Sequence, residues 1–342
     1  MLKKRSLWML HILLFSVLLK THSQSDFHQI KKSIKMNQSL IKPDYLKIGD
    51  TIAIVATAGI IKDKEPIKKA IELAKSWGLN VLLGKNTFNQ TNHFAGTDAE
   101  RLSDLQLALD NKNVKAIWCA RGGYGTVRII DGVDFSKFKQ YPKWVIGYSD
   151  VTVLHSHLHN LGFETLHAML GMSMNIEEEK RLKSVESLKS TLFGKTITYK
   201  VPNSKYNKQG NAKGELVGGN LSILQGLLGS NSSIDTSNKI LFFEEIGEYL
   251  YHIDRMVYAL KRSGYFKNCN GLIIGGMTKI KKNTTPFGKT IEELILDATK
   301  EYDFPIFFDF PAGHDNDNRA LILGRKIEME VGKQNSVIKF ME

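Results

Sequence analysis

Hydrophobic and polar positions alternate along residues 46–162 in a pattern that predicts strands separated by helices. Short apolar runs end in small or turn residues, and the segments between them carry apolar residues at helical spacing. The predicted strands are 51–59, 80–84, 114–120 and 144–148, and the predicted helices are 65–78, 97–111 and 151–162. Strands that alternate with helices form a parallel sheet covered on both faces, and ligands bind beyond the carboxyl ends of its strands.

The pattern changes around residues 185–213, which are polar, rich in lysine and end in turn residues. We interpret 196–213 as a linker between an N-terminal domain (45–195) and a C-terminal domain (214–342). In the second domain, 214–230 predicts a strand or turn followed by a helix. Further strands are expected at 239–248 and 271–278, helices at 251–266 and 290–302, and a strand, a polar loop and a hairpin-like pair over 305–331.

The first residues have the layout of a secretory signal peptide. Lys3, Lys4 and Arg5 precede an apolar run from Leu7 to Leu19, and a short polar stretch follows. The run is too short and too interrupted to predict a membrane span. We therefore expect residues 1–24 to be removed and the protein to be exported, periplasmic or secreted, with no stable membrane span afterwards. A retained anchoring N-terminus and a cytoplasmic location are the alternatives.

Composition indicates a globular protein with no special partner class. Hydrophobic residues make up 42% and charged residues 24% of the chain, which allows an ordinary core. The net charge is +12, and removal of residues 1–24, with four Lys/Arg and no Asp/Glu, would leave +8. The basic residues are scattered, so no nucleic-acid partner is expected. Cys119 and Cys269 lie in apolar segments and are interpreted as buried hydrophobes rather than a disulfide or a metal site.

Ser149 stands where the apolar run KWVIGY meets the predicted helix. A serine there can cap the helix, or it can be a nucleophile beside the free N–H groups of the helix N-terminus. The nucleophile pattern G-x-S-x-G is half met, because Gly147 is present but Val151 replaces the second glycine. The local sequence leaves both interpretations open.

Other candidates lie in turns after apolar runs. The glycines of ARGGYGTVR (120–128) allow a tight turn with exposed N–H groups, suited to an anion or purely structural. Glu244 and Glu245, with Glu248 nearby, follow ILFF, and His314 lies in the loop FPAGHDNDN. On the helix, His155 and His159 of HSHLH share a face, but the glutamate of a zinc-binding H-E-x-x-H motif is missing, so no metal is expected.

Six segments in this order resemble the LD-carboxypeptidase family of serine peptidases, which includes the microcin C immunity-type peptidases. The resemblance runs from Leu46 to Met341 and is carried by ARGGYGTVRIID, KWVIGYSDVTVLH, GELVGGNLSIL, ILFFEEIGEYLYHIDRM, GLIIGGMT and PAGHDNDNRALILG. One departure is LHAMLG, where relatives have a His-Gly-Pro-Met-like stretch. His167 is kept but Ala168 replaces the Gly-Pro pair, which bears on the shape of the substrate pocket.

The resemblance implies a fold and a catalytic site. The fold is α/β, with an N-terminal Rossmann- or flavodoxin-like parallel-sheet domain and a smaller, β-rich C-terminal α/β domain. The implied triad is Ser149, Glu244 and His314. An oxyanion hole is implied from the N–H groups of Asp150 and of a glycine in RGG, Gly123 above all. Further oxyanion or substrate-binding candidates in this turn are Arg121 and Gly122.

The expected activity is removal of the terminal D-alanine from murein tetrapeptides, without a metal or organic cofactor, by a homodimer. One alternative keeps the triad but hydrolyses the amide of a peptidyl or aminoacyl nucleotide, which would give antibiotic immunity. Another is a non-enzymatic protein that binds wall peptides.

Overall fold

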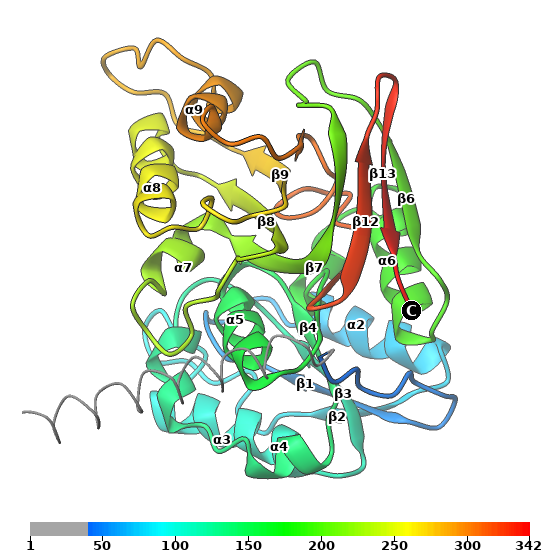
Figure 1. Cartoon of the computed structure of the whole chain (residues 1–342). Helices are drawn as coiled ribbons and strands as arrows, with labels where there is room; N and C mark the ends of the chain where they lie inside the picture. The colour runs from blue at the N-terminus through cyan, green and yellow to red at the C-terminus, as the bar shows by residue number, and fades with distance from the viewer. Residues whose placement is uncertain (1–39) are drawn as a thin grey trace, which may run out of the picture. The chain divides into compact units, whose positions relative to one another are not determined.

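A computed structural model describes residues 40–342, which contain two β-sheets with helices packed against them (Figure 1). The first sheet has the order β11-β5-β4-β3-β1-β2, in which every pair is parallel except the antiparallel edge pair β11–β5. Its strands are β1 (Thr51–Val55), β2 (Asn80–Leu83), β3 (Val114–Cys119), β4 (Trp144–Gly147), β5 (Thr165–His167) and β11 (Leu321–Leu323).

Both faces of the first sheet are buried because successive side chains of a strand point to opposite sides. Ile52 and Ile54 of β1 belong to one apolar core, whereas Ala53 and Val55 belong to another. The helices that cover these faces are α2 (Glu65–Ser76), α3 (Asp98–Asp110), α4 (Ser136–Gln140) and α5 (Thr152–Leu161). A further helix, α6 (Glu178–Leu192), adds Leu188 and Leu192 to the core that the two sheets share. The predicted parallel sheet with two covered faces is confirmed.

The second sheet has the order β10-β9-β8-β7-β12-β13-β6 and is half parallel and half antiparallel. Its strands are β6 (Thr198–Pro202), β7 (Gly210–Asn220), β8 (Lys239–Ile246), β9 (Gly271–Thr278), β10 (Ile306–Phe307), β12 (Lys326–Val331) and β13 (Asn335–Phe340). One face is covered by α7 (Leu221–Gly226), α8 (Leu250–Arg262) and α9 (Ile291–Thr299). The other face shares a core with the first sheet.

The end of the chain differs from the predicted hairpin over 305–331. β11 pairs with β5 in the first sheet, whereas β12 pairs with β7 and β13 in the second, so β11 and β12 are not partners. The chain crosses from one sheet to the other at Gly324, whose φ is +92°. The true hairpin is β12–β13. The segment 196–213 contains β6 and the start of β7.

Three further sequence predictions concern the signal peptide, membrane-spanning helices and the two cysteines. The predicted signal peptide, residues 1–24, lies outside the described residues. Within residues 40–342 no helix is both long and apolar enough to cross a membrane. Cys119 and Cys269 are both buried free thiols, as predicted.

Candidate active site

The candidate residues gather where strands of both sheets end. β4, β3 and β1 are neighbours in the first sheet, so the turns that follow them lie side by side at its carboxyl edge. β4 runs into Ser149, and β3 runs into the glycine turn 120–125. The second sheet supplies Glu244 from β8, and the loop between β10 and β11 supplies His314.

Ser149 has a backbone conformation that serine rarely adopts. Its φ is +65°, in the left-handed region, and it opens a short 3-10 helix, η3 (Ser149–Val151), that continues into α5. Such a conformation costs on the order of 1–3 kcal/mol and persists only where the surrounding structure fixes it. The Ser149 hydroxyl contacts His314 rather than capping the helix.

His314 joins Ser149 to Glu244. Its Nε2 lies 3.1 Å from Ser149 Oγ, and its Nδ1 lies 2.7 Å from Glu244 Oε2. Because a carboxylate can only accept, Nδ1 carries the ring proton, and Nε2 is left free to accept the Ser149 hydroxyl proton. The His314 backbone N–H also donates to Glu244 Oε2, at 3.2 Å, so both the ring and the main chain of the histidine are held.

The two neighbouring carboxylates of β8 have different surroundings. Glu244 is fully buried and faces His314. Glu245 accepts hydrogen bonds from the backbone N–H groups of Ser222 (2.7 Å) and Ile246 (2.8 Å), and it also accepts one from Asn220 Nδ2. The third acidic candidate, Glu248, pairs with His252 of α8 at 2.6 Å. Glu244 is therefore the carboxylate that contacts the histidine.

The loop that carries His314 is fixed by residues that sequence reasoning missed. Gly313 has a φ of +111°, and a Cβ there would lie 2.6 Å from Glu244 Oε2, so only glycine allows this close approach. Asn318 Oδ1 accepts the Gly313 N–H at 2.9 Å, and the Asn318 N–H donates to Ser184 Oγ of α6 at 2.8 Å. The Gly-His pair and the asparagines of PAGHDNDN were the available sequence signal.

The glycine turn after β3 lies against Ser149. A Cβ on Gly122 would be 2.9 Å from both Cβ and Oγ of Ser149, and the φ of Gly123 is +103°. The Arg121 guanidinium donates to the Ile60 carbonyl, so this side chain holds the loop after β1. Asp150 is buried, and its Oδ2 accepts the Thr126 N–H at 2.8 Å. Its backbone N–H belongs to the first turn of a helix, where N–H groups have no intrahelical acceptor.

Substitution of Gly122 by alanine should lower turnover by about 10- to 100-fold, because the added Cβ would displace Ser149 and a misplacement near 1 Å costs about this much. Steady-state kinetics on the peptide substrate that the sequence resemblance implies would measure the effect. The matched control is Gly226→Ala in α7, where no atom lies within 4 Å of the added Cβ. Equal activity of Gly122→Ala and wild type would contradict the expected crowding.

Two aromatic side chains, the half-buried Tyr148 and the buried His167, pack beside the catalytic candidates. The Tyr148 ring lies edge-on to His314, with the ring centroids 4.8 Å apart, and burial, with the nearby charge of Glu244, raises the pKa of Tyr148 to about 12. His167 is fully buried between Tyr148 and Phe242. Burial holds the pKa of His167 well below its ordinary value, so both groups are neutral around the site at pH 7.

The histidines of HSHLH turn to separate partners. His155 contacts Thr165 Oγ1 and the Gly147 carbonyl, each at 2.9 Å. His157 Nδ1 lies 3.0 Å from Ser232 Oγ, and His159 Nε2 lies 3.4 Å from Glu215 Oε2. His155 thus fastens the end of β4, directly before the nucleophile candidate, to β5.

His155 makes stability sensitive to acid. Burial lowers its pKa to about 4, whereas the unfolded value is about 6.5. The unfolded chain therefore binds a proton more readily, and stability that is complete above pH 6.5 is lost as the pH falls toward 4. At 1.36 kcal/mol per pKa unit, the loss is about 3 kcal/mol for this residue. The pKa of His167 is shifted in the same direction.

Urea unfolding at pH 7 and pH 4 would measure this loss. His155→Gln cannot take up the proton, so it should show a smaller fall in unfolding free energy between these two pH values. A fall as large as that of the wild type would contradict the assignment to His155.

A two-sheet α/β fold with a serine, a histidine and a glutamate in contact at the strand ends is that of a serine-type hydrolase. Comparison with known proteins identifies the family of hydrolases to which the chain belongs. The family model described as LD-carboxypeptidase N-terminal domain matches residues 52–168, and that of the C-terminal domain matches residues 213–329. The chain belongs to the LD-carboxypeptidase family and is a serine-type carboxypeptidase.

Several relatives are similar over most of their length. The "Probable murein peptide carboxypeptidase" of Bacillus subtilis (strain 168) is 35% identical over 302 residues, which are 87% of this chain and 94% of the relative. The crystal structure of muramoyltetrapeptide carboxypeptidase from Oxalobacter formigenes is 26% identical with a TM-score of 0.78, covering 85% of this chain and 99% of that one. The structure of the microcin C7 self immunity protein MccF in complex with aspartyl sulfamoyl adenosine is 21% identical with a TM-score of 0.79. The match covers 88% of this chain and 98% of that one, and it shows that the two proteins share the fold.

Proposed function

We propose that this protein removes the terminal D-alanine from murein tetrapeptides by serine-dependent hydrolysis. The observation that carries the proposal is the pair of contacts made by His314, 3.1 Å to Ser149 Oγ and 2.7 Å to Glu244 Oε2. A nucleophile, a base and a group that orients the base define a hydrolytic triad by geometry, whatever their order in the chain.

In the acylation step, Ser149 Oγ attacks the carbonyl carbon of the last peptide bond while His314 Nε2 takes the hydroxyl proton. The tetrahedral intermediate then collapses, and the D-alanine amine leaves with that proton. In the second step, His314 takes a proton from water as the water oxygen attacks the acyl-serine ester. The second tetrahedral intermediate then collapses, His314 returns the proton to Ser149 Oγ, and the shortened peptide is released. The Glu244 carboxylate stabilises the imidazolium formed in both steps.

The backbone N–H groups of Gly123 and Asp150 are proposed to hold the oxyanion. Support comes from the close approach of the glycine turn to Ser149 and from the place of Asp150 in the first turn of the helix. Both donors are main-chain groups on rigid strand ends, so they need no reorganisation as charge develops.

The choice of a murein peptide as substrate is supported by the name of the Bacillus relative at 35% identity, and by that of the Oxalobacter structure. The decisive experiment incubates the full chain with purified muropeptides and follows them by mass spectrometry. The expected result is tetrapeptides converted to tripeptides with release of D-alanine.

Two controls make this experiment specific. A tetrapeptide ending in L-alanine should be left intact, because the proposal concerns a D-configured leaving group. An aminoacyl sulfamoyl adenosine tests the alternative substrate class. Hydrolysis of the adenosine compound alone would replace the murein proposal, whereas binding of tetrapeptide without turnover of either substrate would favour the non-enzymatic alternative.

We also propose that the enzyme acts outside the cytoplasm as a homodimer. Support for export comes from the basic and apolar pattern of residues 1–24, and support for the dimer comes from the family resemblance. Fractionation of the producing cells would test the first point, and light scattering of the purified protein the second. A cytoplasmic monomer would contradict both.

A further inference from the structure

We propose that Arg101 is a positioning residue that fixes the glycine turn beside Ser149 and thereby the spacing of the two N–H groups assigned to the oxyanion. The inference rests on the proposed function, in which Ser149 is the nucleophile. Arg101 lies on α3, 48 positions before Ser149 in the sequence, and its side chain makes no contact with Ser149, Glu244 or His314 among the hydrogen bonds of the described residues.

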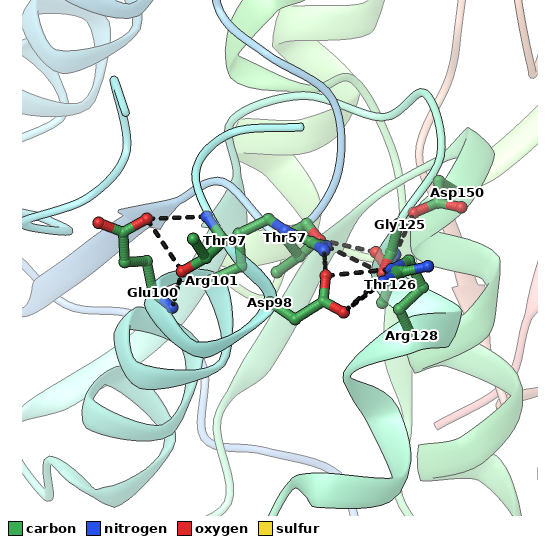
Figure 2. Close-up of polar contacts among 9 residues, drawn as sticks. All are labelled: Thr57, Thr97, Asp98, Glu100, Arg101, Gly125, Thr126, Arg128 and Asp150. Carbon is green, nitrogen blue, oxygen red and sulfur yellow. Dashed lines mark hydrogen bonds and ion pairs between the residues drawn. The ribbon is translucent and has the colours of Figure 1, made fainter. Parts of the chain in front are cut away.

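The Arg101 guanidinium is completely buried and joins three segments (Figure 2). Its Nη1 donates to the Thr57 carbonyl at 2.6 Å and to the Gly125 carbonyl at 2.9 Å. Its Nη2 donates to Asp98 in the first turn of its own helix. Thr57 follows β1 and Gly125 ends the turn that follows β3, so one side chain ties together the carboxyl ends of two neighbouring strands.

The network continues from this turn to the residue after the nucleophile. Thr126 follows Gly125, and its N–H donates to Asp150 Oδ2 at 2.8 Å. The hydroxyls of Thr126 and Thr57 are 2.9 Å apart, which closes the network on the side of β1. Figure 2 shows this sequence of contacts from Asp98 through Arg101 and Gly125 to Asp150. A shift of the turn at Gly125 would therefore move Asp150 and Gly123 relative to each other.

Arginine fits this position because its planar fork can donate to several fixed acceptors at once, which a lysine ammonium cannot reproduce in the same geometry. The acceptors are two backbone carbonyls, which cannot adjust independently, and one carboxylate. Gly125 is adapted to the same contact, since its φ is +143° and a Cβ there would lie 2.6 Å from Arg101 Nη1. The guanidinium thus needs a glycine at position 125, and the Gly125 carbonyl needs the guanidinium as its donor.

Arg128 offers a matched control within the network. It also donates to Asp98, from Nε at 3.0–3.1 Å and from Nη2 at 2.8 Å. The guanidinium groups of Arg128 and Arg101 both lie over the Phe94 ring. The Arg128 side chain, however, is 46% exposed, and it interacts with Asp98 (Figure 2) and with Tyr124 rather than with the Thr57 or Gly125 carbonyl. A change at Arg128 therefore disturbs the shared ion pair without removing a donor from Thr57 or Gly125.

The experiment compares Arg101→Lys, Arg101→Met and Arg128→Lys with wild type on the tetrapeptide. Arg101→Lys should lower kcat by about 10- to 100-fold with KM within about threefold, because misplacement of a catalytic group by about 1 Å costs up to about 100-fold. Arg101→Met should lower kcat at least as far. Arg128→Lys should keep kcat within about twofold of wild type.

A second readout separates positioning from a merely structural role. A peptide boronic acid forms a tetrahedral adduct with the nucleophilic serine and places an oxygen where the oxyanion would be. Its inhibition constant should rise in Arg101→Lys by the same factor as kcat falls, because transition-state mimics lose what the transition state loses. Binding of the intact tetrapeptide, measured in the Ser149→Ala background, should be unchanged by Arg101→Lys.

Unfolding midpoints of all variants are measured alongside. If Arg101→Met does not fold, Arg101→Lys decides alone. A folded Arg101→Lys enzyme with wild-type kcat and boronate affinity would overturn the inference, even if its unfolding midpoint had fallen. So would an equal loss of kcat in Arg128→Lys. An inactive wild type would instead reject the proposed function, so the two failures are distinguishable.

Discussion

Replacing Ser149 by alanine should lower the turnover of a murein tetrapeptide by on the order of 10⁴- to 10⁶-fold, with binding of the peptide retained. The hydroxyl oxygen is the only heavy atom removed, and it is both the attacking atom and the contact of His314 Nε2. The Cβ stays, so the left-handed backbone at residue 149 is equally strained in both proteins. The unfolding free energy should therefore change by no more than about 1 kcal/mol, the net value of one hydrogen bond.

The measurement combines product release with calorimetric titration of the intact tetrapeptide. Because the variant cannot turn the peptide over, its dissociation constant reports ground-state binding directly. Turnover by Ser149→Ala within tenfold of wild type would reject the proposed nucleophile. Loss of peptide binding together with turnover would mean that the hydroxyl acts in recognition rather than in chemistry.

The backbone conformation of Ser149 depends on residues that are distant in the sequence, and the local sequence therefore left its role open. A serine at a strand-to-helix junction is compatible with a helix cap or a nucleophile. The glycine turn that packs against Ser149 lies 27 positions earlier, at Gly122, and the loop that brings His314 to the hydroxyl lies 165 positions later. None of these partners is encoded locally.

Strands β1 to β4 of the first sheet, and the helices α2, α3 and α5, could be predicted because apolar runs alternate there with segments that carry apolar residues at helical spacing. α3, for example, is capped by Thr97, whose side chain accepts the Glu100 N–H in a capping box. The three-residue strand β5 is too short to give such a signal and was not predicted. The strand partner of β11 could not be predicted, because the alternation of a short apolar run indicates a strand but not its neighbour. Pairing with β5 depends on the crossing at Gly324, where a backbone bond to Leu216 fixes the turn.

Arg101 was missed for a similar reason. In the sequence it is one arginine near the start of an amphipathic helix, where charged residues are normally exposed. Its burial depends on the carbonyls of Thr57 and Gly125, which reach it only when the strand ends of β1 and β3 are assembled. Buried charges of this kind become visible in the folded structure alone.

The two glutamates after ILFF show what the alternating direction of side chains along a strand can predict and what it cannot. Neighbouring side chains of a strand point to opposite faces, so only one of Glu244 and Glu245 can face the histidine. The period cannot say which one, and the family resemblance pointed to Glu244. In the structure Glu244 contacts His314, and Glu245 binds the N–H groups of Ser222 and Ile246.

These opposite environments make Glu244→Gln and Glu245→Gln a sharp pair of experiments. Glu244→Gln should lower kcat by on the order of 10³-fold, because the negative charge that stabilises the His314 imidazolium is lost. The amide oxygen can take the place of Oε2 and keep both hydrogen bonds from His314, while the amide nitrogen takes the place of Oε1, which has no hydrogen-bond partner among the described residues. The unpartnered amide nitrogen costs about 1–3 kcal/mol, but removal of a fully buried charge offsets this cost, so the unfolding free energy should stay close to that of wild type.

Glu245→Gln should have the reverse effect. Both oxygens of Glu245 accept backbone N–H groups, so the amide nitrogen of a glutamine must face one of these donors. An unsatisfied buried donor costs about 1–3 kcal/mol of stability, whereas the charge beside His314 is untouched. Kinetics and urea unfolding on both variants measure the two effects separately. Full activity in Glu244→Gln, with a loss of kcat in folded Glu245→Gln, would place the orienting carboxylate on the other face of β8 and reject the proposed triad.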